Sequence, residues 1–181
     1  MSDQRLEIVD YDPAWALSFA TEAEQVATIL APWLDGAVEH VGSTSVPGLR
    51  AKPIVDMLAP VASLEDRASM VRVLADAGWL YWPDDPNAGW RLWLLRPRPE
   101  SRTHHLMVIA VDDPYVETLV AFRDVLRGDA GLRGAYAELK LGLAARYESN
   151  RNAYTNAKSD FIAEALRGVG VEPPERSRLP E

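Results

Sequence analysis

The segment from His40 to Asp56 contains the residues of this chain best suited to chemistry. It begins as a short β-prone stretch, passes through a Gly-Ser turn into small polar residues, and ends in a carboxylate inside an apolar run. Glycine lets the backbone turn tightly enough to aim successive N–H groups at one point, and neighbouring hydroxyls add further donors. The pattern predicts a loop that cradles phosphate oxygens, formed by Gly42, Ser43, Thr44 and Ser45.

Asp56 lies between Val55 and Met57 in a stretch that we expect to be largely buried. An ionised carboxylate is costly there unless a metal ion, a cation or several donors meet it. The apolar neighbours therefore predict a partner for Asp56, and Lys52 of the same loop is one candidate. Short motifs also arise by chance. The alternative is a plain turn, with Asp56 acting as a cap or pairing with a structural arginine.

A later β-prone stretch is preceded by Arg102 and begins with His104 and His105. Side chains alternate along a strand, so His105 shares a face with Met107 while His104 points the other way. Only one of the two histidines can then face a common pocket, and alternation alone leaves open which one it is. The alternative is that the ring fills a gap and bonds to the backbone, and both interpretations also apply to His40.

Three of the 19 basic residues are lysines, namely Lys52, Lys140 and Lys158. In a chain that otherwise uses arginine, a compact ammonium group indicates a point contact with phosphate or with a buried carboxylate. Tyr154 and Lys158 are one helical turn apart, as are Tyr136 and Lys140, so each predicted helix presents a hydroxyl and a cation on one face. The alternative is a solvated helix face with inward-packed tyrosines, which we favour for Tyr136.

The hydrophobic pattern predicts the helices and strands that position these residues. One helix starts at Asp12-Pro13, a second runs from a Ser63 cap to Gly78, and a third starts at Asp113-Pro114 and ends near Arg127. This order of elements predicts an α+β fold with a mixed, mostly antiparallel sheet. Further helices are expected over 135–146 and 152–167, after a break over 128–134, and strands over 37–41, 54–59, 79–82, 91–96 and 103–111.

The length of 181 residues is that of one domain. We expect residues 1–168 to form it, and residues 169–181, rich in Pro, Glu and Arg, to be a disordered or loosely attached tail. The central tryptophans suggest either a base-stacking platform or core, and core is the more common use. They are Trp79, Trp82, Trp90 and Trp93.

The charge and composition of the chain limit the kinds of partner that it is expected to bind. The net charge of −8 disfavours long nucleic acids, although locally converging cations can still hold a small phosphorylated ligand. The absence of cysteine excludes disulfides, thiolate nucleophiles and Cys-ligated zinc, and it indicates a reducing compartment. No apolar run approaches the ~20 residues that cross a bilayer, and the first residues do not read as a signal peptide. We therefore expect a cytoplasmic protein without a membrane partner, of undetermined oligomeric state.

The run GSTSVPGLRAKPIVD, from Gly42 to Asp56, resembles the GrpB family, as do His104-His105-Leu106 and the regions of Lys140 and 154–158. Members of this family are similar to the nucleotidyltransferase superfamily. The resemblance implies an α+β nucleotidyltransferase-like fold in which a Gly-Ser turn opens a helix before a strand aspartate. By that analogy the turn holds nucleotide phosphates and Asp56 binds a divalent metal, expected to be Mg²⁺. The implied pocket is formed by Gly42, Ser43, Thr44, Ser45, Lys52, Asp56, Arg102, His105, Lys140, Tyr154 and Lys158.

One position departs from active nucleotidyltransferases. Those enzymes carry two carboxylates, two residues apart on this strand, that clamp Mg²⁺ from one face. Here the second position is Leu58, so any catalysis would rest on Asp56 and Lys52. The leading hypothesis is binding of a nucleotide or another phosphorylated small molecule, with transfer of a nucleotidyl or phosphoryl group as the reaction. The alternative is a non-catalytic accessory domain, because family members occur fused to dephospho-coenzyme A kinases.

Overall fold

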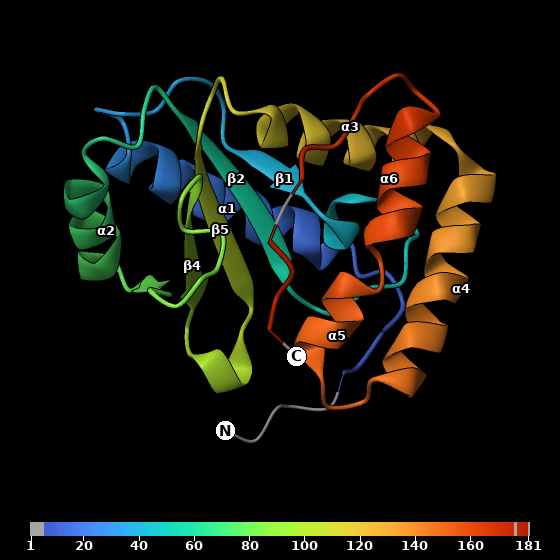
Figure 1. Ribbon diagram of the computed structural model, residues 1–181. Coiled ribbons are helices and arrows are strands. Elements are labelled where there is room, and N and C mark those ends of the chain that lie inside the picture. The colour runs from blue at the N-terminus through green and yellow to red at the C-terminus, as the bar shows by residue number, and fades with distance from the viewer. Residues whose placement is uncertain (1–5, 176, 181) are drawn as a thin grey trace.

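A mixed β-sheet forms the centre of the molecule (Figure 1). The computed structural model describes residues 6–175 and 177–180, and within them the strand order is β1-β2-β5-β4-β3. β2 runs parallel to β5, and every other neighbouring pair is antiparallel, which confirms the predicted α+β class and mixed sheet. The strands are β1 (Glu39–Val41), β2 (Val55–Val61), β3 (Leu80–Tyr81), β4 (Arg91–Arg96) and β5 (His104–Ala110).

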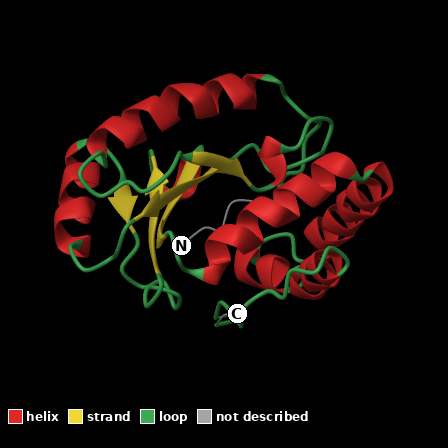
Figure 2. Ribbon diagram, turned by 90° about the horizontal axis from the view of Figure 1, so that it is seen from above, coloured by secondary structure: helices red, strands yellow, loops and turns green. Residues whose placement is uncertain are grey.

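Helices lie on both sides of the sheet (Figure 2). α1 (Ala14–Ile29) and α2 (Arg67–Asp76) cover one face, and α3 (Pro114–Gly128) covers the other. α4 (Ala130–Arg146), α5 (Arg151–Asn156) and α6 (Ser159–Arg167) lie on the side of α3. No helix in the described part of the chain is both long and apolar enough to cross a bilayer.

The predicted helix boundaries are confirmed where a local cap sets them. The Asp113 carboxylate accepts a hydrogen bond from the backbone N–H of Tyr115, with proline at the first helical position of α3. Asp12 accepts in the same way from the N–H of Ala14, at the start of α1. Gly78 follows α2 with φ +86°, a left-handed conformation that favours glycine after a helix.

Three helix predictions are wrong. The second helix, expected to run from a Ser63 cap, begins only at Arg67, with Asp66 before it, so Ser63 does not cap it. The expected break over 128–134 is replaced by a start of α4 at Ala130, because the Asp129 carboxylate accepts from the N–H of Leu132 and caps the helix. The single helix expected over 152–167 is divided into α5 and α6 at Ala157 and Lys158. Both residues are ordinary helix formers, so the local sequence does not predict this division.

The C-terminal segment was expected from its composition to be a disordered or loosely attached tail. Two of its described residues, Leu179 and Pro180, hydrogen-bond to α5. Leu179 and Asn156 exchange two such bonds, of 2.9 and 3.0 Å. Composition reports few apolar side chains, and it does not report backbone groups that pair with asparagines elsewhere in the fold.

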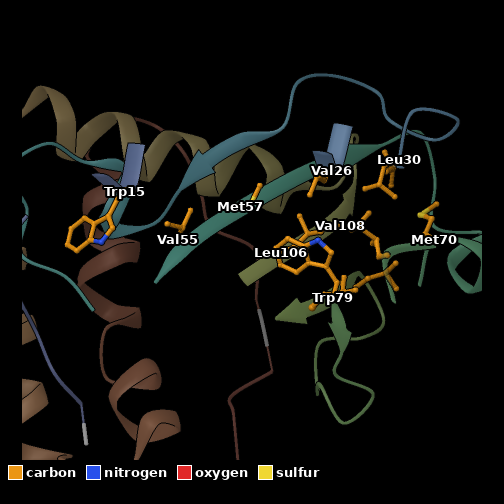
Figure 3. Packing of buried hydrophobic residues seen from close by; sticks show 14 of the residues in the cluster. Trp15, Val26, Leu30, Val55, Met57, Met70, Trp79, Leu106 and Val108 are labelled. Carbon is orange, nitrogen blue, oxygen red and sulfur yellow. The ribbon is translucent and has the colours of Figure 1, made fainter. Parts of the chain in front are cut away.

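The main hydrophobic core lies between the sheet and the α1–α2 pair (Figure 3). We call this side of the sheet the core face. Trp79 is 1% exposed there, so the prediction that the tryptophans are core holds for this one. Full burial of one such large side chain contributes about 1.5–3 kcal/mol. The labelled core residues are Trp15, Val26, Leu30, Val55, Met57, Met70, Trp79, Leu106 and Val108.

Candidate functional site

The opposite side of the sheet, which we call the cavity face, opens into a cavity of about 680 Å³. Its walls come from the turn after β1, from β2, β4 and β5, from α4 and α5, and from the C-terminal segment. The cavity therefore gathers segments far apart in sequence. The predicted site residues that line it are Gly42, Ser43, Lys52, Asp56, Arg102, His105, Lys140, Tyr154 and Lys158.

Thr44 and Ser45 do not line the cavity, which corrects their predicted role as phosphate ligands. Both are buried: the Thr44 hydroxyl donates to the carbonyl of Ile54 at 3.1 Å, and the Ser45 hydroxyl donates to the carbonyl of Gly42 at 2.6 Å. The Thr44 oxygen then accepts from His40 Nε2 at 3.0 Å. These side chains hold the turn in shape from behind, because their donors are already used.

His40 is a structural residue in this arrangement. Its ring stacks on Phe19, with centroids 4.6 Å apart. Burial, reinforced by the charges of Arg127 and Arg123 and opposed by that of Asp56, lowers the pKa of His40 to about 4. The imidazole is therefore neutral at physiological pH, and its N–H supports Thr44.

Gly42 brings the turn into contact with the strand carboxylate. It has φ +69° and ψ −172°, a backbone conformation that is essentially restricted to glycine. A Cβ atom at this position would lie 2.5 Å from Asp56 Oδ2, so the close approach also excludes a side chain. The turn continues as a short 3₁₀ helix, Ser43–Ser45, in place of the longer helix that the resemblance implies.

Asp56 and His105 form a hydrogen-bonded pair at the floor of the cavity. They face each other across the parallel β2–β5 pair, and His105 Nδ1 donates to Asp56 Oδ1 at 2.9 Å. Burial favours a raised pKa for Asp56, but the hydrogen bond from His105 and the charges of Lys52 and Lys158 outweigh it and hold the pKa below its usual range. The carboxylate is therefore ionised.

One ring nitrogen of His105 is not used in the hydrogen bond to Asp56. Burial lowers the pKa of His105, against the opposing influence of Asp56, so the ring is neutral at physiological pH. Its side chain is 10% exposed, and Nε2 is buried without a hydrogen-bond partner among the described residues. A neutral imidazole that donates through Nδ1 to a carboxylate leaves Nε2 as an acceptor.

The adjacent His104 lies on the core face and is fully bonded. Its Nε2 lies 3.0 Å from the hydroxyl of Ser18 on α1, and its Nδ1 lies 2.9 Å from the hydroxyl of Thr103. Strand alternation thus divides the two histidines between the faces, as the sequence indicates.

The lysines converge on the cavity from three segments. The Nζ atoms of Lys52 and Lys158 lie 4.7 and 4.4 Å from the centroid of the Tyr154 ring. Both ammonium groups also act on the carboxylate of Asp56. Burial raises the pKa of Tyr154, so its hydroxyl remains protonated beside the two cations.

Lys140 is the most buried of the three lysines, with 2% of its surface exposed. Its ammonium donates to the backbone carbonyl of Arg50 and lies 4.9 Å from the Tyr136 ring centroid, and Tyr136 itself is packed inward, as predicted. Burial, reinforced by the charge of Lys52, lowers the pKa of Lys140 to about 7. An anion in the cavity would stabilise the protonated form.

One part of the cavity wall was not predicted from the sequence. There a buried ion pair joins Arg91 to Asp85, with Nε–Oδ2 and Nη2–Oδ1 distances of 2.7 and 3.0 Å. The Arg91 guanidinium stacks 4.2 Å from the Trp93 ring centroid, and Trp93 lies 4.9 Å from the ring of His105. A charged residue at the start of an otherwise apolar strand is the signal that could have identified Arg91.

The donor set does not fit a Mg²⁺ site. Mg²⁺ prefers several oxygen ligands in octahedral geometry. Of the cavity carboxylates, Asp56 is bonded to His105 and Asp85 to Arg91, and the described residues contain no group of three potential metal ligands. Leu58, at the second position of the nucleotidyltransferase pattern, is fully buried among apolar side chains.

The charge of the cavity is opposite to that of the whole chain. Among the described residues, six basic and three acidic side chains line it, whereas the chain carries a net charge of −8. Cations that converge in this way attract a small anion. The basic lining consists of Lys52, Arg91, Arg102, Lys140, Arg151 and Lys158.

Fold and cavity together define an α+β protein of the nucleotidyltransferase-like type, with one strand carboxylate and a cationic pocket. Comparison with known proteins gives the family: residues 5–167 match the GrpB protein family, to which this chain belongs. The resemblance seen in the sequence is thereby confirmed.

Relatives share most of this chain. A UPF0157 protein of Pseudomonas aeruginosa is 41% identical over 170 residues, covering 91% of this chain and 67% of the relative. A UPF0157 protein of Bacillus subtilis is 33% identical and covers 90% of this chain, which spans only 46% of that longer relative. The crystal structure of the conserved protein GrpB from Enterococcus faecalis superposes with a TM-score of 0.79 at 31% identity, covering 90% of this chain and 99% of that one.

Proposed function

We propose that the cavity binds a nucleotide or another phosphorylated small molecule. The observation that carries this proposal is the convergence of all three lysines of an acidic chain on one cavity. Ammonium groups placed this close repel one another, as the effect of Lys52 on Lys140 shows. A phosphate group would offset that repulsion and accept charge-assisted hydrogen bonds worth roughly 1.5–3 kcal/mol each.

The cavity lining contains groups suited to both ends of a nucleotide. The phosphates would lie against the lysines and the Gly42–Ser43 turn, and the aromatic side chains of Trp82 and Trp93, which also line the cavity, would lie beside a base. The volume of about 680 Å³ lies within the ~300–1,000 Å³ typical of small-molecule sites. Arg102 lies 5.7 Å from the Trp82 ring centroid and would add a cation beside the base.

Binding of a phosphorylated ligand is better supported than transfer of a nucleotidyl or phosphoryl group by a two-metal mechanism. The single strand carboxylate is already bonded to His105, and Leu58 supplies no second ligand. In this proposal Asp56 orients the imidazole and balances part of the lysine charge. Any Mg²⁺ would enter with the phosphates, which supply the oxygen ligands that the described side chains lack.

A thermal-shift series tests the proposal. Inorganic phosphate, pyrophosphate, AMP, ADP and ATP are added with and without Mg²⁺ to the wild type and to Lys158→Met, with Arg72→Met on exposed α2 as a control. We expect ADP or ATP to raise the melting temperature of the wild type and of Arg72→Met by several degrees but not that of Lys158→Met, because a ligand that binds only the folded state stabilises it. No shift with any compound would overturn the proposal and favour the accessory-domain alternative.

A further inference from the structure

The C-terminal segment runs back across the cavity. After α6 the chain turns and passes the cavity face to end beside α5 (Figure 1). Two of its residues, Leu179 and Pro180, form part of the cavity wall. We call residues 174, 175 and 177–180 the strap.

Two asparagines of α5 hold the end of the strap by its backbone. Asn156 Nδ2 donates to the carbonyl of Leu179 at 2.9 Å, and the N–H of Leu179 donates to Asn156 Oδ1 at 3.0 Å. Asn152, one helical turn earlier, donates to the carbonyl of Pro180 at 2.7 Å. The side-chain amides thus hydrogen-bond to the strap backbone in the way that the backbone of a neighbouring β-strand would.

Two further contacts hold the start of the strap. The hydroxyl of Tyr115 on α3 donates to the carbonyl of Pro174 at 3.3 Å, and Asn87 Nδ2 donates to the carbonyl of Ser177 at 3.5 Å. Asn87 also lines the cavity. The strap is therefore held at both ends by side chains of other segments.

The character of these contacts makes the strap easy to open. Each of the hydrogen bonds just described joins a protein side chain to the strap backbone, and water can replace either partner when the strap leaves. None of the hydrophobic clusters formed by the described residues includes a strap residue. The strap also lies beyond residues 5–167, the part matched by the family. It is thus held by exchangeable bonds outside the matched region.

We propose that the strap is a lid that opens to admit the ligand and closes over it. The identity of the ligand rests on the function proposed above, whereas the opening of the lid can be measured without any ligand. A lid of this kind slows both entry and escape of a ligand, because both require the open state.

The first experiment measures access to the cavity in the empty protein. Because the chain has no cysteine, Ser43→Cys places a single thiol in the cavity lining, and its reaction rate with a disulfide reagent reports opening. We expect Asn152→Ala combined with Asn156→Ala to raise that rate by about tenfold, since three strap bonds are lost. A thiol at Ala75, exposed on α2, is the control and should react at an unchanged rate.

An equal thiol rate with and without the asparagines would overturn the lid. Asn156 is buried, so its loss could also loosen the fold, and Asn152→Ala alone and Leu179→Gly provide gentler variants with native circular dichroism as the criterion. Local opening of the strap is supported if the thiol rate rises in the double asparagine variant, in Asn152→Ala and in Leu179→Gly, while the rate of Ala75→Cys is unaffected.

The second experiment measures ATP binding by stopped-flow tryptophan fluorescence, using Trp82 and Trp93 of the cavity as reporters. We expect Asn152→Ala to raise the association and dissociation rate constants together, each several-fold, with little change in Kd. Unchanged rates would overturn the lid. Absence of ATP binding in both proteins would instead overturn the proposed ligand, and the thiol rates would still decide the lid.

Discussion

Residues of the same type have different environments on the two faces of the sheet. His104 and His105 are neighbours in the chain, yet His104 is fully bonded on the core face and His105 keeps an unpartnered nitrogen on the cavity face. The same contrast holds for tryptophan: Trp79 is buried among apolar side chains, whereas Trp93 borders the cavity beneath a guanidinium group.

If the proposed function holds, one small sheet serves both stability and binding. On the core face, apolar burial supplies free energy and polar atoms are paired within the protein. On the cavity face, under the proposed function, ammonium groups and a turn would receive an anion, and the cost of burying these charges would be offset by the core face. Changes on the core face should therefore alter stability, and changes on the cavity face should alter ligand binding.

The largest expected effect is the loss of a core-face tryptophan. Trp79→Ala removes a side chain that is 1% exposed, and we expect a loss of about 3–5 kcal/mol in the free energy of unfolding. Trp93→Ala removes a half-buried side chain on the cavity face, so it should lower the free energy of unfolding by clearly less. Urea denaturation monitored by circular dichroism measures both. A greater loss for Trp93→Ala would refute the division between the faces.

Acid should weaken the support behind the cavity turn. The pKa of His40 is lowered, mainly by burial, from 6.5 to about 4, so the unfolded chain binds a proton before the folded one does. The free energy of unfolding should therefore fall as the pH decreases from 6.5 to about 4, by up to about 3 kcal/mol from this residue.

His40→Gln is the matched variant for this measurement. It keeps an N–H donor for Thr44 but does not titrate, so its stability should decline less between pH 6.5 and about 4. Identical pH profiles for the variant and the wild type would show that His40 does not contribute. His104 and His105 also have lowered pKa values, so a residual decline is expected.

A pair of glycine variants separates backbone strain from the contact with the carboxylate. Gly42 and Gly48 both have positive φ, but a Cβ on Gly42 would meet Asp56 Oδ2 at 2.5 Å, whereas a Cβ on Gly48 would meet nothing within 4 Å. We expect each alanine variant to lose about 1–3 kcal/mol through backbone strain. Only Gly42→Ala should also weaken ligand binding. Equal ligand affinities in the two variants would contradict the contact.

The smallest expected effect is a gain in stability on the cavity face. Burial lowers the pKa of Lys140 to about 7, so the wild type becomes more stable as the pH rises from 7 towards 10.5. Lys140→Met should be more stable than the wild type at pH 7 by about 1 kcal/mol, since the gain is offset by the unpaired carbonyl of Arg50. Thermal unfolding at pH 7 and 10 tests this, and a less stable variant at pH 7 would contradict it.

Local patterns in the sequence were sufficient for much of the site. The Gly-Ser turn and the carboxylate of Asp56 in an apolar run identify the cavity floor, strand alternation admits only one of His104 and His105 to it, and the scarcity of lysine points to its cationic wall. These signals lie within a few residues of one another or follow a fixed period. The family resemblance supplied the rest of the prediction.

Other features depend on contacts that no local pattern encodes. The Arg91–Asp85 pair forms only when a loop folds back on β4, and the strap is held by asparagines that precede it by more than twenty residues. Thr44 and Ser45 were misassigned because a hydroxyl that supports a turn and one that faces a ligand have the same sequence signal. Only the tertiary structure decides between those roles.

Isothermal titration with ATP tests the division of the sheet most directly. The wild type and Ser18→Ala, which alters the bonding of His104 on the core face, should bind one ATP with the same Kd. Lys52→Met combined with Lys158→Met should weaken binding by about a hundredfold or more, because two charge-assisted contacts are lost. Equal affinity in the double variant and the wild type, or no binding by the wild type, would contradict an anion site on the cavity face.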